Sequence, residues 1–325
     1  MSGGTGTAPG AASGTAPGVT VRVPAKVNVQ LAVGAARPDG FHDLASVFLA
    51  VSLYDEVTAA PADRLTVTCE GPDADRVPLD RTNLAARAAE LLAARHGLDP
   101  AVRLHIRKAI PVAGGMAGGS ADGAAALLAC DALWGLATPR ATLLDLCAEL
   151  GSDVPFSLVG GAALGLGRGE RLTELPVGGT FHWVFAVADG GLSTPVVFGA
   201  FDRLAEGRDI PVPAASPALL DALADGDTTA LAGTLANDLQ AAALSLRPEL
   251  AATLAAGTGA GALAALVSGS GPTTAFLVKD ADAATAVAEA LLASGTCRAT
   301  HTATSPAPGA TVLRAGTPAP GATLL

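Results

Sequence analysis

The segment PVAGGMAGGSA, residues 111–121, places small residues directly before an alanine-rich stretch that is typical of a helix. Glycines allow the backbone to take positive φ values and bring its N–H groups close to a ligand. The first turn of the following helix adds unpaired N–H groups and the positive end of the helix dipole. We therefore expect this loop to hold an anion, with phosphate the best fit. A tight turn packed with small residues remains the alternative.

Two familiar nucleotide-binding motifs do not describe this loop. Lys108 precedes the glycines and no lysine follows them within the motif, so the GxxxxGK[ST] spacing of a P-loop is missing. The segments at 165–170 (GLGRGE) and 257–262 (GTGAGA) lack the preceding strand, the spacing and the acidic residue of a dinucleotide fingerprint. The sequence therefore predicts neither a Walker-type nucleotide site nor an NAD-dependent oxidoreductase.

The elements that must position the loop alternate between β-branched and alanine-rich segments. Strands are expected at 19–35, 42–53, 64–71 and 101–110, with a turn at 37–40. A helix is expected at 82–97, with Thr82 as its N-cap and Gly97 as its stop. The glycine-rich loop thus lies between a strand and a helix, where a phosphate-binding loop is expected.

Composition limits the kinds of partner. The 325 residues, half of them hydrophobic, suffice for a sizeable core and two domains. A net charge of −10 argues against binding to nucleic acid, and no long apolar run predicts a membrane span. The cysteines, Cys69, Cys130, Cys147 and Cys297, lack zinc-site spacing. They indicate reduced, buried thiols in a cytoplasmic protein.

The two ends of the chain are rich in turn-forming residues. Residues 1–18 repeat GTAPG and lack the basic and apolar regions of a signal peptide, so we expect a disordered tail. Near the other end, PAPGATVL at 306–313 returns as PAPGATLL at 318–325. The first copy is expected to end a strand, and residues 314–325 to form a loose tail.

Several stretches together resemble the GHMP kinases, a superfamily that includes galactokinase, homoserine kinase and mevalonate kinase. Its loop pattern, PxxxGLGSSSA, is matched by Pro111, Gly115, Ser120 and Ala121, whereas residues 116–119 depart from it. Further matches follow in the family's order: PAKVNVQLAVGAARPDGFH (24–42), GSDVPF (151–156), STPVVF (193–198), NDLQ (237–240) and VSGSGPTTAF (267–276). One branch of the superfamily, whose substrate carries a cytidine diphosphate group, resembles this chain most. It shares the departures in the loop, the DGFH segment and the STPVVF segment.

The resemblance implies two catalytic residues. Asp153 corresponds to the base that accepts the proton of the substrate hydroxyl, and Lys26 to its cationic partner. From its window alone, Asp153 would instead cap a helix, and Lys26 would extend its charge into solvent. Asn28 lies two residues from Lys26 in a strand and therefore on the same face, which favours a shared polar site.

The resemblance also implies two binding regions. The ATP-binding residues are Pro111, Val112, Ala113, Gly114, Gly115, Met116, Ala117, Gly118, Gly119, Ser120 and Ala121 of the loop, with Asn83 and Lys108 at the adenosine. The substrate-binding residues are Asn28, Phe41, His42, Thr194, Phe198, Gly269, Ser270 and Gly271. Phe41 and Phe198 are expected to stack on the cytosine and His42 to read its edge, with core packing as the alternative for either ring. Mg²⁺ is expected with ATP, without assigned ligands, because Gly119 stands where relatives have a serine.

The implied activity is ATP-dependent phosphorylation of the 2-hydroxyl of 4-diphosphocytidyl-2-C-methyl-D-erythritol, a step of non-mevalonate isoprenoid synthesis. Another small-molecule GHMP kinase, of homoserine or mevalonate type, is the alternative, and an RNA-binding module of S5-like fold disagrees with the acidic charge. The implied fold is α+β, with a ribosomal-S5-like domain at 19–170 and a ferredoxin-like domain at 171–313. The active site is expected in the cleft between them.

Overall fold

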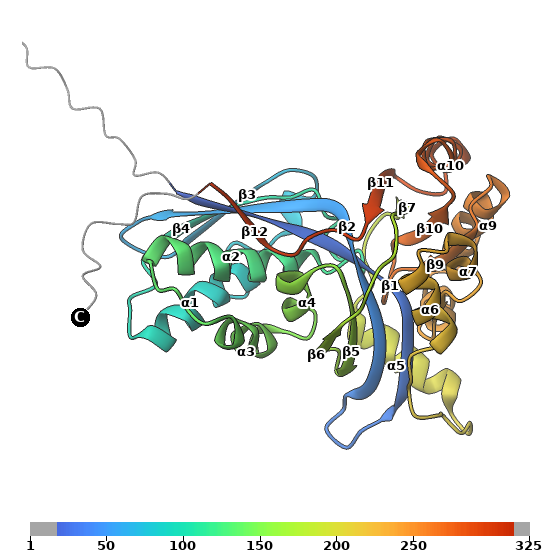
Figure 1. The fold of residues 1–325 in the computed structure, drawn as a ribbon, viewed down its shortest axis with the longest axis horizontal. Helices are drawn as coiled ribbons and strands as arrows, with labels where there is room; N and C mark the ends of the chain where they lie inside the picture. Colours follow the sequence, from blue (N-terminus) through green and yellow to red (C-terminus); the bar gives the residue numbers. More distant parts are fainter. Residues whose placement is uncertain (1–17, 315–325) are drawn as a thin grey trace, which may run out of the picture.

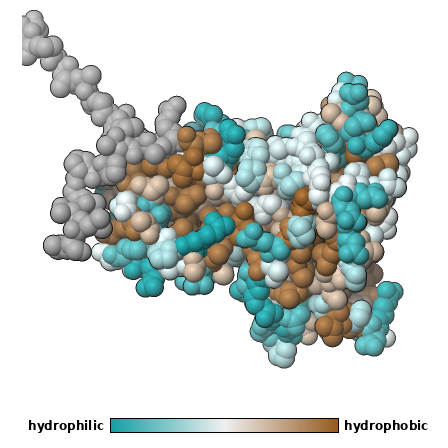
Figure 2. All heavy atoms as spheres, in the orientation of Figure 1, coloured by the Kyte–Doolittle hydropathy of each residue, from teal (hydrophilic) through white to brown (hydrophobic). Residues whose placement is uncertain are grey.

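The computed structural model describes residues 18–314, and two sheets with flanking helices make up this part of the chain (Figure 1). The tails expected at 1–18 and 314–325 lie outside the described residues, apart from Gly18 and Arg314 themselves. None of the helices between residues 18 and 314 has the length and apolar character that crossing a bilayer requires. In the face shown by Figure 2, hydrophobic residues form separate patches between hydrophilic ones.

The larger sheet is organised by two long antiparallel strands, β1 (Val19–Ala36) and β2 (His42–Pro61). The turn expected at 37–40 joins them. The remaining strands are β3 (Thr66–Glu70), β4 (Val102–Arg107), β5 (Ala162–Gly167), β6 (Arg171–Glu174), β8 (Ala236–Asn237) and β12 (Thr311–Arg314). The order is β12-β1-β2-β4-β3, with β5 also on β2, β6 on β5 and β8 on β1. Because β6, β8 and β12 follow residue 170 in sequence, this sheet draws on both halves of the chain.

Four helices gather beside the larger sheet: α1 (Leu84–His96), α2 (Gly118–Trp134), α3 (Arg140–Leu150) and α4 (Val154–Val159) (Figure 1). Helix α2 packs against both β1 and β2 and is buried along most of its length. Alanine and glycine suit this position because their small side chains let a helix approach its neighbours on several sides. The core therefore holds the helix that begins at the glycine-rich loop.

The smaller sheet is antiparallel, in the order β11-β7-β10-β9. Its strands are β7 (Phe181–Val187), β9 (Ala264–Val267), β10 (Thr274–Val278) and β11 (Ala299–Ser305). The period of two in β7 separates two cores: Trp183 and Phe185 belong to the main core, whereas Val184 and Ala186 pack with α10 (Ala281–Ser294). The sheet is therefore buried on both faces, which explains the unbroken apolar run of β10.

The other helices of the second half are α5 (Thr194–Ala205), α6 (Pro217–Asp225), α7 (Thr228–Ala232), α8 (Gln240–Leu246) and α9 (Leu250–Gly259). A short 3-10 turn, η1 (Ala74–Arg76), precedes α1. Helix α5 packs against α8, and α9 against α10. Through α5, this half of the chain supplies one wall of the site described below.

The elements expected from the sequence are present with shifted ends. The expected strand at 42–53 continues to Pro61, because alternation persists through the Val57 and Ala59 side chains of the core. The helix expected at 82–97 spans Leu84–His96, and the prediction of Thr82 as its N-cap is wrong by one residue. Asn83 is the cap, since its side-chain oxygen accepts a hydrogen bond from the Ala85 N–H at 2.8 Å. Gly97 ends the helix at a φ of 67°, as predicted.

Candidate functional site

A cavity of about 720 Å³ opens between the larger sheet, the glycine-rich loop and α5. Most of the residues singled out in the sequence line it, although they come from distant parts of the chain. They are Lys26, Asn28, Phe41, His42, Ala113, Gly114, Gly115, Ala117, Gly118, Gly119, Ser120, Asp153, Thr194, Phe198, Gly269, Ser270 and Gly271. The structure therefore brings together the loop, the charged pair and the aromatic residues in one cavity.

The glycine-rich loop takes a conformation that few residues adopt. Ala113, Gly115 and Ala117 all have positive φ values, of 54°, 78° and 61°. At Gly115 this is combined with a close approach, because a Cβ there would lie 2.1 Å from the carbonyl oxygen of Ser268. The Ser268 hydroxyl donates to the Gly115 carbonyl at 3.2 Å. The loop is thus fastened directly to the second glycine motif, residues 268–272.

The start of α2 leaves backbone N–H groups free for a ligand. Its N-cap, Ala117, has no polar side chain, and within the described residues no side chain caps the first turn. Gly118, Gly119 and Ser120 line the cavity at this turn. A Cβ on Gly119 would have Leu84 Cδ1, at 3.9 Å, as its only described neighbour within 4 Å. The helix end is therefore open on the cavity side, as a phosphate site requires.

Lys26 and Asp153 form an ion pair at one wall of the cavity, with 3.5 Å between Nζ and Oδ2. Asp153 occupies the N-cap position of α4, yet in residues 18–314 its side chain accepts no capping hydrogen bond. The capping role that its sequence window favours is therefore not taken up. The Lys26 side chain is 6% exposed and that of Asp153 is 33% exposed, so the carboxylate is the member that a ligand can reach.

A chain of polar side chains holds Lys26 in place. Its ammonium group donates to Asn28 Oδ1 at 2.5 Å, and the Asn28 amide donates to Ser46 Oγ at 2.6 Å. The ammonium also lies 5.6 Å from the centre of the Phe48 ring, within the range of a cation–π contact. Lys26 is therefore fixed on β1 with its charge directed at Asp153 rather than into solvent.

The aromatic residues gather at the other part of the cavity. The rings of His42 and Phe198 stack with their centres 4.9 Å apart and an angle of 28° between their planes. His42 Nε2 is 2.8 Å from Asp202 Oδ1. Phe41 is 49% exposed, and the Arg168 guanidinium lies over its ring at 5.2 Å. The exposed face of Phe41 is free for stacking, whereas one face of Phe198 is covered by His42.

The N-terminal end of α5 contacts the second glycine motif in this cavity. Thr194, the first residue of the helix, lies 3.0 Å from Ser270 between the two hydroxyl oxygens. Gly269 approaches the ion pair so closely that a Cβ there would be 3.2 Å from Asn28 Oδ1 and 3.4 Å from Lys26 Nζ. The motif therefore forms a wall between the charged pair and α5.

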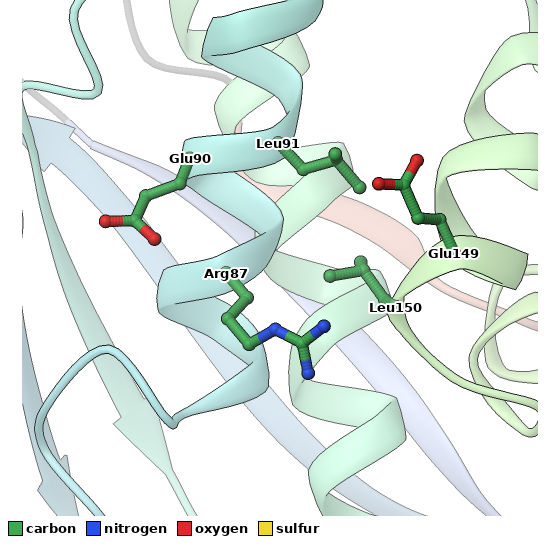
Figure 3. Close-up of a pocket in the computed structure, with 5 residues that line it drawn as sticks. All are labelled: Arg87, Glu90, Leu91, Glu149 and Leu150. Carbon is green, nitrogen blue, oxygen red and sulfur yellow. The ribbon is translucent and has the colours of Figure 1, made fainter.

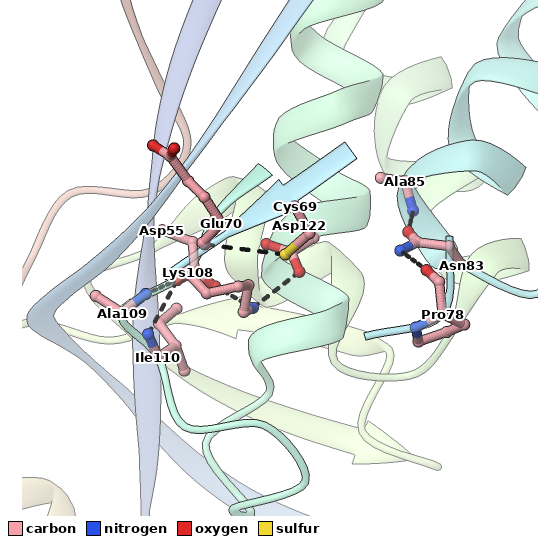
Figure 4. A network of polar contacts seen from close by, with 10 residues as sticks. All are labelled: Asp55, Cys69, Glu70, Pro78, Asn83, Ala85, Lys108, Ala109, Ile110 and Asp122. Carbon is pink, nitrogen blue, oxygen red and sulfur yellow. Dashed lines mark hydrogen bonds and ion pairs between the residues drawn. The ribbon is translucent and has the colours of Figure 1, made fainter. Parts of the chain in front are cut away.

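Some expected site residues lie behind the wall of the cavity in the described structure. Met116 and Ala121 are fully buried in the core, and Pro111 and Val112 do not line the cavity. Asn83 and Lys108, assigned to adenosine from the family resemblance, use their polar atoms inside the protein. The Asn83 amide donates to the Pro78 carbonyl at 2.7 Å, and Lys108 pairs with two buried aspartates (Figure 4). Their contact with adenosine stays a prediction that this arrangement does not support.

Four further residues complete the site without having been predicted. Ser46 lies two residues from Phe48 in β2 and therefore on the same face of the strand. Asp202 lies one helical turn after Phe198 on α5. Both residues could therefore be found from periodicity. Asn237, in the NDLQ segment, donates to the carbonyls of Val267 and Gly269, at 2.8 Å each. Arg168 has no such local signal, because it lies in the turn between β5 and β6 and reaches Phe41 only through the fold.

A second, smaller hollow of about 270 Å³ lies between α1 and α3 (Figure 3). It is lined by Arg87, Glu90, Leu91, Glu149 and Leu150, none of which lines the larger cavity. Figure 3 shows its charged side chains spread around the rim rather than directed at one point. The larger cavity is therefore the candidate active site.

Comparisons with known proteins agree with this arrangement. Residues 83–161 match the family model of the GHMP kinases N terminal domain, and residues 219–296 match that of the GHMP kinases C terminal domain. Proteins from Streptomyces avermitilis and Streptomyces coelicolor are 78% and 75% identical to this chain. Each match covers 91% of this chain and 99% of the relative, and both relatives are named 4-diphosphocytidyl-2-C-methyl-D-erythritol kinase.

Solved structures show the same fold. A crystal structure of 4-(cytidine 5'-diphospho)-2C-methyl-D-erythritol kinase has a TM-score of 0.70 and 35% identity, covering 87% of this chain and 98% of the other. A homoserine kinase from Cytophaga hutchinsonii has a TM-score of 0.66 at 20% identity, covering 91% of this chain and 97% of the other. The second likeness concerns the fold alone. The α+β fold of two GHMP kinase domains, expected from the sequence, is confirmed.

Proposed function

This chain belongs to the family of 4-diphosphocytidyl-2-C-methyl-D-erythritol kinases, and we propose that it transfers the γ-phosphoryl group of ATP to the 2-hydroxyl of that cytidine diphosphate alcohol. The observation that carries the proposal is the Lys26–Asp153 pair in the same cavity as the open start of α2. A phosphoryl-transfer site needs a nucleophile and a phosphate held in line, with charge stabilised around them. The cavity offers both in one place.

Asp153 is the group that we assign to the substrate hydroxyl. The ammonium of Lys26 lies 3.5 Å from the Asp153 carboxylate, which accepts the hydroxyl proton as the bond to phosphorus forms. Asn28 and Ser46 keep that ammonium in place, so its charge is already oriented before the substrate binds. Lys26 lies on β1 and Asp153 at the start of α4, so the packing of these elements sets the distance.

The loop at 113–120 is the part that we assign to the ATP phosphates. Its backbone N–H groups and the N-terminal end of α2 provide donors and partial positive charge without a lysine in the loop. The fastening of Gly115 to Ser268 keeps these donors in position. The adenosine end of the nucleotide is expected to bind residues outside this loop.

Mg²⁺ is expected with ATP because a divalent ion offsets phosphate charge and stabilises the leaving group. Within residues 18–314 there is no group of three or more His, Cys, Asp or Glu placed to hold a metal ion. When the ion is bound with ATP, phosphate oxygens and water would hold most of it, and the Ser120 hydroxyl and the Asp153 carboxylate, which both line the cavity, would be the protein oxygens nearest to hand. Independently of the ion, Ser120 orients the phosphate end of ATP and Asp153 orients the substrate hydroxyl.

The cytidine end of the substrate is assigned to the aromatic part of the cavity. Phe41 offers an exposed ring face, and Phe198 carries His42 against it with Asp202 behind the imidazole. Stacking on aromatic rings and hydrogen bonds at the base edge are the usual means of holding a pyrimidine. Arg168, which lies over Phe41 and lines the cavity, is the cation that we assign to the diphosphate.

The domain boundaries at 19–170 and 171–313 and a cytoplasmic location are further parts of this proposal. All four cysteines are unpaired in the structure, which agrees with a reducing compartment. Burial raises the pKa of the Cys147 thiol to about 12, so this residue is a packed side chain rather than a nucleophile. The net charge of −10 supports a small-molecule substrate rather than a nucleic-acid partner.

The test is an ADP-release assay with purified protein, ATP and Mg²⁺. We expect ADP to form only when the cytidine diphosphate alcohol is present, and phosphorus NMR to show a new phosphate monoester on the product. Homoserine and mevalonate, the substrates of other GHMP kinases, are tested separately as alternative substrates. If either one is phosphorylated and the cytidine substrate is not, the proposed substrate is wrong, whereas the assignment of the fold still holds.

A further inference from the structure

Three charged side chains are buried together behind the glycine-rich loop. Lys108 Nζ pairs with Asp55 Oδ2 and, at 2.8 Å, with Asp122 Oδ2 (Figure 4). The side chains of Lys108, Asp55 and Asp122 are only 1%, 0% and 4% exposed. We call Lys108, Asp55 and Asp122 the buried triad. None of its members lines the cavity in the described structure, so direct contact with the substrate does not explain it.

The two carboxylates of the buried triad hold opposite ends of the loop. Asp55, on β2, accepts hydrogen bonds from the N–H groups of Ala109 at 2.6 Å and Ile110 at 2.9 Å, where the chain enters the loop. Asp122 belongs to α2, into which the loop leads. Because both bind the same ammonium group, the buried triad joins the entry and the exit of residues 111–117.

The buried triad also touches the turn that presents amides to the cavity. A Cβ on Gly118 would lie 3.1 Å from Lys108 Nζ and 3.1 Å from Ile110 Cγ2. Gly118 itself lines the cavity, so the ammonium group lies directly behind the wall of the proposed phosphate site. A small shift of Lys108 is therefore transmitted to the first turn of α2.

Stability alone is a weak reason for this arrangement. Buried ion pairs often contribute no more than apolar residues of similar size, because desolvation opposes their attraction. Here two carboxylates share one ammonium group, and Asp122 Oδ1 has no hydrogen-bond partner within residues 18–314. What the cluster provides is a fixed geometry between β2, the loop entry and α2.

We propose that Asp122 and Asp55 are positioning residues for ATP, which act through Lys108 by fixing the loop entry relative to the first turn of α2. This inference rests on the proposed ATP site and deepens it. Misplaced amides weaken contact with phosphate groups, whereas the cytidine diphosphate alcohol depends on residues of β1, α4 and α5 on other walls of the cavity. A change in the buried triad should therefore raise the KM for ATP and leave the KM for the alcohol unchanged.

The test compares Asp122→Asn with a matched control, Asp131→Asn, on the same helix. Asp131 is also buried, and its carboxylate accepts the Thr138 N–H at 3.0 Å at the opposite end of α2. For Asp122→Asn we expect the KM for ATP to rise about tenfold, because the amide oxygen binds the Lys108 ammonium more weakly than the carboxyl group that it replaces, with the KM for the alcohol unchanged. For Asp131→Asn we expect both values to stay at those of the unchanged protein.

Asp55→Asn provides a second variant if Asp122→Asn does not fold, since its amide oxygen can still accept the Ala109 and Ile110 N–H groups. Titration with a fluorescent ATP analogue measures nucleotide affinity without turnover, and we expect a loss of about tenfold in either variant. Equal changes in both KM values, no change in nucleotide affinity, or the same effect from Asp131→Asn would overturn the positioning role. If the unchanged protein binds the analogue but phosphorylates nothing, the proposed substrate fails and the positioning role is still decided by the titration.

Discussion

The close approach of Gly115 to Ser268 makes Gly115→Ala a stringent test of the loop. The new Cβ would lie 2.1 Å from the Ser268 carbonyl oxygen, whereas ordinary contacts begin at 3.4 Å, so these atoms must separate by about 1.3 Å. Such a movement breaks the hydrogen bond from Ser268 Oγ to the Gly115 carbonyl and disturbs the one from Thr273 N to the Gly114 carbonyl. The loop and the second glycine motif would no longer be joined.

The size of the effect follows from these losses. Each hydrogen bond contributes about 1 kcal/mol, and an alanine at the φ of 78° found here costs about another 1–2 kcal/mol. We therefore expect Gly115→Ala to lower the free energy of unfolding by about 3–4 kcal/mol and to abolish measurable ATP affinity. The measurement is urea unfolding followed by circular dichroism, with nucleotide titration of the folded fraction.

Gly119→Ala is the matched control in the same glycine-rich segment, residues 111–121. A Cβ there would have Leu84 Cδ1, 3.9 Å away, as its only described neighbour within 4 Å, and the residue already lies in α2. Alanine favours helices, so we expect the unfolding free energy to stay constant or to rise by up to about 1 kcal/mol. If Gly115→Ala unfolds at the urea concentration of the unchanged protein, the loop does not pack against residues 268–271 as described.

Three further predictions concern single side chains. Asp153→Asn should lower kcat at least ~100-fold with little change in ATP affinity, because it removes the base; near-normal turnover in steady-state kinetics would exclude that role. Phe198→Ala should weaken binding of the cytidine substrate by ~1–3 kcal/mol through loss of a stacking surface. Isothermal titration calorimetry measures this affinity, and Phe201→Leu, at a residue that does not line the cavity, should bind the substrate normally. Burial raises the pKa of Asp122 well above its usual range, so the folded protein keeps this proton to a higher pH than the unfolded chain. Its contribution to the unfolding free energy therefore falls as pH rises above the usual aspartate range, and urea unfolding of Asp122→Asn should lack this fall.

The local parts of the fold were predictable because they depend on neighbouring residues. Alternation in 19–35 and an αL glycine after the first helix are properties of short windows, and both appear in the structure. The cap of that helix was misplaced by one residue because Thr82 and Asn83 are both good capping residues. The backbone decides between them, and Asn83 reaches the Ala85 N–H whereas Thr82 bonds to Asp80.

The site was predictable only where a motif kept its residues together. The loop and Asp153 each lie in a recognisable segment, so their identity could be read before their positions were known. Arg168 and Asn237 act across large separations in sequence: Arg168 lies over Phe41, and Asn237 holds the carbonyls of Val267 and Gly269. No spacing rule connects such residues, because the first contact depends on the pairing of β5 with β2 and the second on how the two sheets pack. For the same reason, the role of Lys108 as the centre of a buried cluster was not visible.

The loop and the charged pair are not independent parts of the site. The Lys26 N–H donates to the Met116 carbonyl at 3.3 Å, and Met116 is fully buried, so the core holds the middle of the loop against β1. On the other side, Gly269 lies close to both Lys26 and the loop, since a Cβ placed on it would be 3.4 Å from Lys26 Nζ and 3.1 Å from the Gly115 carbonyl oxygen. A displacement of the loop therefore reaches Lys26 in two ways, through its backbone N–H and through Gly269. Because the transferred phosphoryl group has to meet the hydroxyl in line, this coupling makes the loop set the geometry of the reaction as well as the affinity for the nucleotide.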